Sequence, residues 1–234
     1  MKLTYDLHTH ILPGVDDGAK NTEEAMQLIE ALRSQGVSNI CLTPHFYSHK
    51  ESTADFLSRR DEAAKQFLPL VPDDVTIRLG AEVFVTKYLF SDDNDLCSLC
   101  IQGTPYMLTE FSYDSRFGDS TIRQIEEIRS RGIVPVLPHV ERYPVLMKNK
   151  QILEDLIYMG IIIQSNAISF SETFLKRKLS KMIYSGHIQV LSTDTHSMRR
   201  NPPQSLSLAL DYLSKKYDDD IIRKLESNAK NLFI

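Results

Sequence analysis

The chain has 234 residues, of which 42% are hydrophobic and 25% charged, and its formal net charge is −4. This balance is typical of a globular protein with a substantial core, and it lacks the clustered positive charge of a nucleic-acid-binding domain. The sequence contains no run of about 18 consecutive apolar residues and its first residues contain no apolar signal-peptide core, so we expect a cytoplasmic protein without membrane insertion.

Short apolar runs alternate along the chain with longer segments of helical period. The runs that predict strands are Thr4–Leu7, Asn39–Leu42, Thr76–Leu79, Tyr106–Glu110, Ile133–Leu137, Ile161–Gln164 and Ile188–Leu191. The first helix is expected to begin with a capping box, Asn21 and Glu24, and to end at Gly36. The later helices are expected at Ser120–Arg131, Lys150–Met159, Ser171–Ser185 and Gln204–Lys216.

This order predicts an α/β fold, because about seven strand-then-helix units favour parallel strands joined by right-handed crossovers. An open doubly wound sheet is the alternative, but no glycine-rich phosphate loop follows the first strand. A barrel explains the pattern better, and its active site would lie at the carboxyl ends of the strands. Neither a linker nor an internal repeat divides the sequence, so residues 1–234 are predicted to form a single domain.

Five of the seven histidines lie in short strings that follow or close the apolar runs. The strings are Asp6-Leu7-His8-Thr9-His10, Thr43-Pro44-His45, Pro138-His139-Val140-Glu141-Arg142 and Thr193-Asp194-Thr195-His196. Side chains two positions apart on a strand point the same way, so each His-x-His or Asp-x-His pair can share one site. Glu82 and Glu110 are each expected to end a strand-like run. Together with them, these strings predict a polynuclear metal site, and nitrogen with oxygen ligands suits Zn, Mn or Fe. A metal-dependent hydrolase is the function that this pattern favours.

Several other residues have two interpretations from sequence alone. Asp17, in Asp16-Asp17-Gly18, is either a ligand or part of a solvated turn. Arg142, Arg199 and Arg200 either bind phosphate or face solvent. Cys97 and Cys100 form a lone CxxC pair in a chain with three cysteines, which favours a structural or incidental origin over a zinc or redox role. We interpret His49 as a surface residue and His187 as a structural one.

The segment from Asp6 to His10, with Leu12-Pro13-Gly14-Val15-Asp16-Asp17-Gly18 behind it, resembles the first motif of the PHP (polymerase and histidinol phosphatase) superfamily. More narrowly, the chain is similar to the bacterial tyrosine phosphatases of capsular and exopolysaccharide operons, the CpsB/YwqE type. The similarity runs from residue 4 to the C-terminal Asn228-Ala229-Lys230-Asn231-Leu232-Phe233. It implies a distorted, TIM-like (β/α)7 barrel that holds three divalent ions, commonly manganese or iron, with zinc as a further option.

The resemblance also implies a role for each site residue. One ion would be held by His8, His10, Glu82 and Asp194. Glu82 would bridge it to a second ion, bound by Glu110 and His139. A third ion would be held by Asp17, His45 and His196. Arg142 matches the family's phosphate-side arginine, whereas Arg199 and Arg200 compete for a second substrate-binding position. Catalysis is expected to depend on Arg142, Asp194 and His139.

The implied reaction is hydrolysis of phosphotyrosine by a hydroxide that the metals activate, without a phospho-enzyme intermediate. Tyrosinate is a good leaving group because the pKa of tyrosine is about 10. The substrate implied by the resemblance is the tyrosine-rich tail of an autophosphorylating kinase that controls polysaccharide export. Two alternatives remain: a small-molecule phosphomonoesterase such as histidinol phosphatase, and a non-catalytic metal-binding module.

Overall fold

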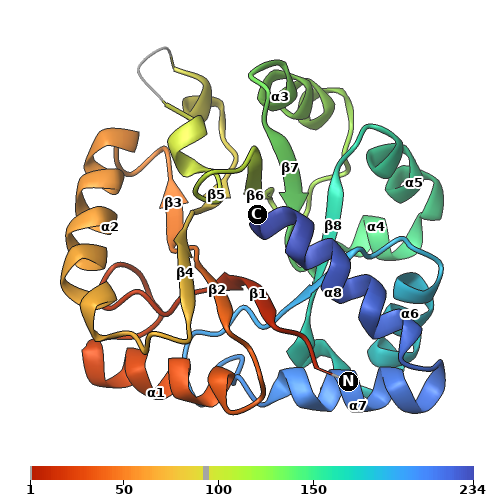
Figure 1. Cartoon of the computed structure of the whole chain (residues 1–234). Helices are drawn as coiled ribbons and strands as arrows, with labels where there is room; N and C mark the ends of the chain where they lie inside the picture. Colours follow the sequence, from red (N-terminus) through yellow and green to blue (C-terminus); the bar gives the residue numbers. More distant parts are fainter. Residues whose placement is uncertain (1, 92–94) are drawn as a thin grey trace.

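The computed structural model describes residues 2–91 and 95–234, and all pairings between its strands are parallel (Figure 1). One sheet has the order β1-β2-β4, and the other has the order β3-β5-β6-β7-β8-β9. The strands of the first sheet are β1 (Tyr5–Thr9), β2 (Asn39–Leu42) and β4 (Thr76–Leu79). Those of the second are β3 (His45–Tyr47), β5 (Glu82–Phe84), β6 (Tyr106–Glu110), β7 (Val134–Leu137), β8 (Ile162–Asn166) and β9 (Val190–Ser192).

The two sheets form one ring of strands, because β3 continues β2 after Pro44 and β5 continues β4 after Gly80. The Glu82 amide donates to the Pro44 carbonyl at 3.0 Å, and the Gly80 amide donates to the Leu42 carbonyl at 2.9 Å, so the ladder runs on across both interruptions. The last join is a single parallel bridge between Thr9 and Thr195. The predicted α/β fold with parallel strands is therefore confirmed, and the ring departs from a regular barrel at the two interruptions and at the single Thr9–Thr195 bridge.

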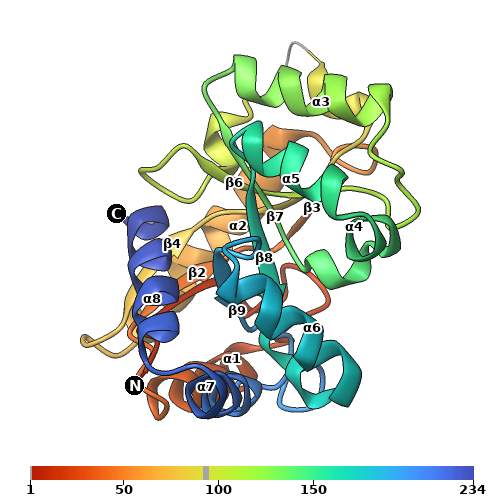
Figure 2. The ribbon, with the colours of Figure 1, turned by 90° about the vertical axis from the view of Figure 1, so that its right-hand side faces the viewer.

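Helices surround the strands on the outside (Figures 1 and 2). Their bounds are α1 (Thr22–Arg33), α2 (Thr53–Phe67), α3 (Asp119–Ser130), α4 (Pro144–Lys148), α5 (Lys150–Tyr158), α6 (Thr173–Tyr184), α7 (Ser205–Lys216) and α8 (Asp220–Phe233). The capping box before α1 is confirmed, since the Asn21 side chain accepts the Glu24 amide at 2.9 Å and the Glu24 carboxylate accepts the Lys20 amide at 3.0 Å. Sequence analysis identified α1, α3, α5, α6 and α7 but missed α2, α4 and α8.

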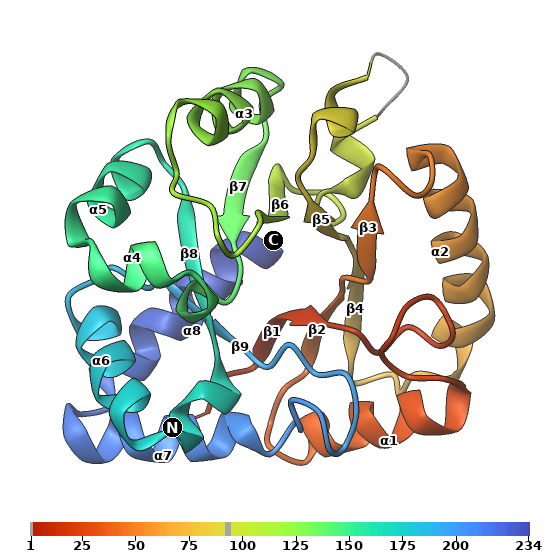
Figure 3. The same cartoon turned by 180° about the vertical axis from the view of Figure 1, so that it is seen from behind.

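The core fills the layer between the strands and the helices, and a smaller apolar cluster is closed by α8. Leu232 and Phe233 pack there with residues of several strands, including Leu7 and Val190. The end of α8 accordingly overlies the middle of the ring in Figures 1 and 3. Apolar side chains therefore fill the ring next to α8. The polar residues gather where the strands end.

Candidate metal centre

The histidine-containing strings come together at one side of the strand ring. His8 lies in β1, His139 follows β7, and Asp194 follows β9. The expectation that Glu82 closes a strand is wrong, because Glu82 is the first residue of β5 and pairs in register with His45, the first residue of β3. The interruptions after β2 and β4 therefore place two site residues where the strands resume.

Four side chains converge on one point. The Nε2 atoms of His8 and His10 lie 3.1 Å apart, and Glu82 Oε2 lies 3.3 Å from each of them. Asp194 Oδ1 lies 3.5 Å from His8 Nε2 and 3.2 Å from His10 Nε2. Ligand atoms placed about 2.1 Å from one ion in a tetrahedron are about 3.4 Å apart. The spacing of this set fits a single divalent ion.

The oxygen atoms of this set also need a cation. Glu82 Oε2 and Asp194 Oδ1 are buried and have no hydrogen-bond partner among the described residues, and both side chains are 1% exposed. A buried carboxylate without a compensating charge is costly, so an ion among these atoms would offset that cost.

Glu82 also faces a second group through its other oxygen. Glu82 Oε1 lies 2.7 Å from His139 Nε2, which is 3.6 Å from Glu110 Oε1. On the opposite side, Glu82 Oε2 lies 2.9 Å from His45 Nδ1, and ligand atoms of His45, Glu82 and Glu110 lie within 4.8 Å of one another. A carboxylate shared between two groups of ligands is the arrangement that the bridging role of Glu82 requires.

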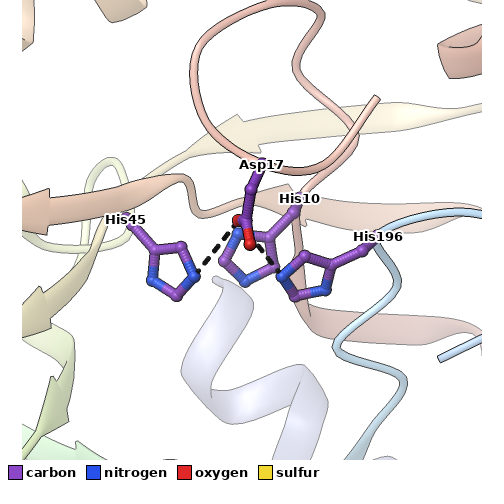
Figure 4. Close-up of side chains that lie close together, drawn as sticks. All are labelled: His10, Asp17, His45 and His196. Atoms are coloured by element: carbon purple, nitrogen blue, oxygen red, sulfur yellow. Dashed lines mark ion pairs between the residues drawn. The ribbon is translucent and has the colours of Figure 1, made fainter. Parts of the chain in front are cut away.

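Asp17 lies at the centre of a third group, with His10, His45 and His196 around it (Figure 4). Asp17 Oδ1 lies 3.5 Å from His45 Nε2 and 3.6 Å from His196 Nε2. The His196 Nε2 atom is buried without a hydrogen-bond partner in the part of the chain that is described. The Asp16-Asp17-Gly18 turn therefore carries a candidate ligand, although 54% of the Asp17 side chain is exposed.

Hydrogen bonds at the Nδ1 atoms orient two of the imidazole rings. Asp16 Oδ2 accepts from His10 Nδ1 at 2.6 Å and from the His45 amide at 3.0 Å. The Asp194 carbonyl accepts from His196 Nδ1 at 2.8 Å. A hydrogen bond at Nδ1 fixes the tautomer that leaves Nε2 free for a metal. The sequence analysis gives Asp16 no role. Its position two residues before Gly18 is the only feature of the sequence that could have pointed to one.

Asp194 is held by several donors. Its Oδ2 accepts from Asn166 at 2.7 Å, from Asn201 at 2.9 Å and from Arg142 at 2.9 Å, and this leaves Oδ1 directed at His8 and His10. Asp194 and His139 adopt positive φ angles, 55° and 37°, which residues with a side chain rarely adopt. Asn166 and Asn201 escaped sequence analysis because neither lies in a histidine-containing string.

Burial and mutual contact shift the pKa values of these groups. Burial alone would lower the pKa of His10, but Asp16, Asp194 and Glu82 together raise it well above its ordinary value. For His196, burial and the neighbouring His10 lower the pKa to about 4. Burial and the nearby Glu82 raise the pKa of the Glu110 carboxyl. Groups with such divergent pKa values inside one cluster are typical of functional sites.

The three arginines differ in what they contact. Arg142 donates to Asp194 and, through Nη1 at 3.2 Å, to the Tyr113 hydroxyl, which itself donates to Glu110. Arg200 donates to Asp17 Oδ2. Arg199 lines a cavity of about 400 Å³ next to Asp17 and Lys20. Arg142 thus adjoins the first two groups of ligands, and Arg200 adjoins the third.

The remaining candidates lie outside the three groups. Cys97 is exposed in a 3-10 turn, whereas Cys100 and Cys41 are buried, and all three are free thiols. His49 is exposed, and His187 is half-buried between Ser185 and Glu154. These positions agree with the structural and surface interpretations made from sequence.

The chain matches the family model described as capsular polysaccharide synthesis, CpsB/CapC, over residues 4–234. It is 30% identical to the tyrosine-protein phosphatase CpsB of Streptococcus pneumoniae, covering 98% of this chain and 94% of that protein. It is 25% identical to the tyrosine-protein phosphatase YwqE of Bacillus subtilis, covering 97% and 90%. The chain also superposes on a solved structure from a study of YwqE and CpsB, which are described there as metal-dependent tyrosine phosphatases. The TM-score is 0.83 at 23% identity, and the match covers 98% of this chain and 94% of that one.

Proposed function

The chain belongs to the CpsB/CapC family of capsular polysaccharide synthesis, and on that premise we propose that it is a metal-dependent phosphatase that hydrolyses phosphotyrosine in proteins. The observation that carries the proposal is the convergence of His8, His10, Glu82 and Asp194, with two buried carboxylate oxygens that accept no hydrogen bond from the described residues. The relatives that share this family and are named tyrosine-protein phosphatases support the choice of substrate.

We further propose that the site takes three divalent ions, of which manganese is the preferred one, with iron or zinc as alternatives. His8, His10, Glu82 and Asp194 would hold the first ion, Glu82, Glu110 and His139 the second, and Asp17, His45 and His196 the third. The donor set supports a borderline-hard divalent ion, because it combines imidazole nitrogen with carboxylate oxygen and includes no thiolate. When bound, such ions supply positive charge for phosphate oxygens and a water molecule of lowered pKa.

Within this proposal, the chain's own residues position the phosphoryl group. Arg142 has its guanidinium between Asp194 and Tyr113, so its planar fork is held in place before substrate arrives. The fork can donate to two phosphoryl oxygens, on which charge redistributes as the leaving group departs. Arg199 and Arg200 extend the positive charge on the Asp17 side, where Arg200 is engaged by Asp17 and Arg199 lines the adjoining cavity.

Cysteine chemistry is disfavoured by the positions of the thiols. Burial raises the pKa of Cys100 to about 12, and burial raises that of Cys41 well above its ordinary value. A nucleophilic cysteine needs a lowered pKa. The sequence also has no Cys-x5-Arg loop. Tyrosinate leaves without a strong acid, so a water molecule can deliver the final proton.

We also propose that residues 1–234 act as one phosphatase domain on the tyrosine-rich tail of an autophosphorylating bacterial kinase that controls capsule or exopolysaccharide synthesis. The match to the family model over residues 4–234 supports the single domain, and the family's description supports the process. Among the helices of residues 2–91 and 95–234, none has the length and apolar character that a membrane span needs.

The proposal is tested by comparing substrates on one preparation. The protein is assayed with a phosphotyrosine peptide, a phosphoserine peptide and histidinol phosphate in the presence of Mn²⁺. The phosphotyrosine peptide should have the highest kcat/KM, and His139→Ala should abolish its turnover with little loss of helical content. A preference for histidinol phosphate would assign the chain to small-molecule chemistry instead. Absence of turnover with every phosphoester and metal would favour a non-catalytic metal-binding module.

A further inference from the structure

Two cavities follow one another along the flank formed by α4, α5 and α6. The first, which we call the Tyr113 cavity, has a volume of about 970 Å³ and lies between the loop after β6 and the residues that join α4 to α5. The second, the Met182 cavity, has a volume of about 450 Å³ and lies between α4, α5 and α6. Lys148 and Lys150 line both cavities, and the three helices follow one another along one flank in Figures 2 and 3. We call the two cavities together the lysine groove.

The lysine groove is basic although the whole chain is acidic. Its basic lining residues outnumber one lining carboxylate, that of Asp114, and are Arg116, Lys148, Lys150, Lys178 and Lys181. Lys150 pairs with Glu154 at 2.6 Å, and Lys178 donates to the Met147 carbonyl. Lys148 and Lys181 are exposed and have no ion-pair partner within the described ranges 2–91 and 95–234. The groove therefore concentrates uncompensated positive charge on a protein whose formal net charge is −4.

The floor of the Met182 cavity is apolar. Leu146 and Leu153 are buried beneath it, and Met147 and Met182 are half-buried. A free phosphate or another small anion would gain nothing from such a floor. A peptide can place acidic side chains on the lysines and apolar side chains on the floor, so the combination favours a peptide.

The lysine groove begins at the metal centre. Tyr113 lines the Tyr113 cavity, and its hydroxyl accepts from Arg142 and donates to Glu110. Tyr113 is therefore shared by the groove and by the contacts of Arg142, so a chain that places a phosphorylated side chain at Arg142 lies next to the groove. This continuity ties the occupant of the groove to the substrate of the site.

We propose that the lysine groove binds an acidic segment of the phosphoprotein substrate, adjacent in sequence to the phosphotyrosine. The proposal rests on the phosphotyrosine phosphatase function proposed above and adds a sequence preference to it. Substrates with carboxylates on the flank that enters the groove are bound more tightly, and because the contact lies away from the reacting phosphorus it acts chiefly on KM.

The test compares two phosphotyrosine peptides, one flanked by alternating glutamate and leucine and one flanked by glutamine and serine. In the wild-type protein the acidic peptide should have the higher kcat/KM, and its advantage should shrink as salt is added, because exposed charges are screened. Lys148→Glu/Lys181→Glu should reduce that advantage roughly tenfold, mainly through KM. The matched control, Lys65→Glu/Lys215→Glu, reverses two exposed lysines on α2 and α7 and should preserve it.

Two further measurements separate failure of the groove from failure of the active site. Hydrolysis of p-nitrophenyl phosphate should be unchanged in both double variants, which shows that the metal centre is intact. Fluorescence anisotropy with the unphosphorylated acidic peptide should show binding that Lys148→Glu/Lys181→Glu weakens, and this result would support the groove even if no phosphoester is hydrolysed. An equal preference in wild type and the groove variant would overturn the proposal. Lysine-dependent binding of phosphatidylserine vesicles without any peptide preference would overturn it in favour of a membrane surface.

Discussion

At the scale of residues, the site is organised by side chains that hold the candidate ligands rather than by the ligands alone. Asp16 orients His10, and Asn166, Asn201 and Arg142 hold one oxygen of Asp194, so the other oxygen stays directed at the first group of ligands. Such outer contacts restrict each ligand to one tautomer or rotamer.

Arg142→Lys should keep the positive charge and yet lose much of the rate. A lysine cannot reproduce the planar fork that reaches Asp194 and the transferring phosphoryl group. The loss of one preorganised donor costs about 3 kcal/mol, or about a hundredfold in kcat, with a smaller change in KM. Metal content should not change, because arginine is not a ligand. The control is Arg131→Lys at the C-terminal cap of α3, where the side chain pairs with Glu127. Wild-type kcat and KM in Arg142→Lys would show that Arg142 does not act on the phosphoryl group.

Tyr113→Phe should lower kcat about tenfold while leaving metal content and stability nearly unchanged. The substitution removes the hydroxyl that joins Glu110 to Arg142, and a hydrogen bond to a charged group contributes about 1.5 kcal/mol. Steady-state kinetics with p-nitrophenyl phosphate measures the effect independently of any peptide flank. Tyr158→Phe, at a side chain that is 94% exposed, serves as the control. An unchanged kcat in Tyr113→Phe would mean that Arg142 is positioned by Asp194 alone.

At the scale of elements, the loop after β1 carries both an orienting residue and a candidate ligand. Its path depends on Gly18, because a Cβ atom at that position would lie 1.9 Å from the His10 carbonyl oxygen. The backbone of the Asp16-Asp17-Gly18 turn therefore packs directly against the strand end that bears His10. A side chain at position 18 must therefore displace either the turn or the strand end.

Gly18→Ala should destabilise the protein by about 2 kcal/mol or more and should weaken metal binding at the third group. Thermal unfolding and metal analysis of the same preparation measure the two effects. Gly118→Ala, where an added Cβ meets no atom within 4 Å, should cost less than about 1 kcal/mol. Wild-type stability and metal content in Gly18→Ala would contradict the proposed packing of the turn.

The elements that sequence analysis found and missed differ in the strength of their local signals. All seven predicted strands exist, because each is an apolar run between turn residues. The missed strands β3 and β5 have three residues each and follow Pro44 and Gly80, so no pattern of alternation could develop. Helix α2 lacks a continuous apolar face, since Arg60 is among its buried residues. Helix α8 differs, because its buried residues Ile221, Leu225 and Leu232 recur at helical spacing and were available as a signal in the sequence.

The site residues also differ in how strongly the local sequence predicts them. The pairs His8/His10 and Asp194/His196 were predictable because histidine and carboxylate at alternate positions form a local motif. Glu82 and Glu110 stand in less diagnostic strings. Gln164, which accepts from the His139 amide at 2.8 Å, and Asn201, which donates to Asp194, have no local motif. They reach the site only because β8 and the segment after β9 fold next to it. Their roles follow from the three-dimensional arrangement, which spacing along the sequence does not encode.

At the scale of the whole molecule, the ring of strands brings six separated segments to one centre and buries most of its charge. Burial alone would lower the pKa of His8, but Glu82 and Asp194 together raise it by more than burial lowers it. The pKa of His10 is also raised. Protons therefore compete with metal for both imidazoles in the metal-free protein. A centre of this kind couples metal binding to proton release.

Metal affinity should rise with pH. A divalent ion requires the neutral imidazole, and because the pKa values of His8 and His10 lie above 6.5 in the metal-free protein, the rise should continue above pH 6.5. Calorimetric titration of the metal-free protein with Mn²⁺, in two buffers of different ionisation enthalpy, measures the number of protons released. An affinity that is constant between pH 6 and pH 8, with no proton release, would contradict this coupling.

The most direct test of the account measures metal content and phosphotyrosine hydrolysis on the same samples. Protein purified without chelator is analysed for bound ions and assayed with a phosphotyrosine peptide, then again after EDTA treatment and after Mn²⁺ is restored. We predict more than one ion per chain, loss of turnover with loss of metal, and recovery on restoring Mn²⁺. A metal content near zero together with full turnover in EDTA would contradict the proposal that the buried histidines and carboxylates form a catalytic metal centre.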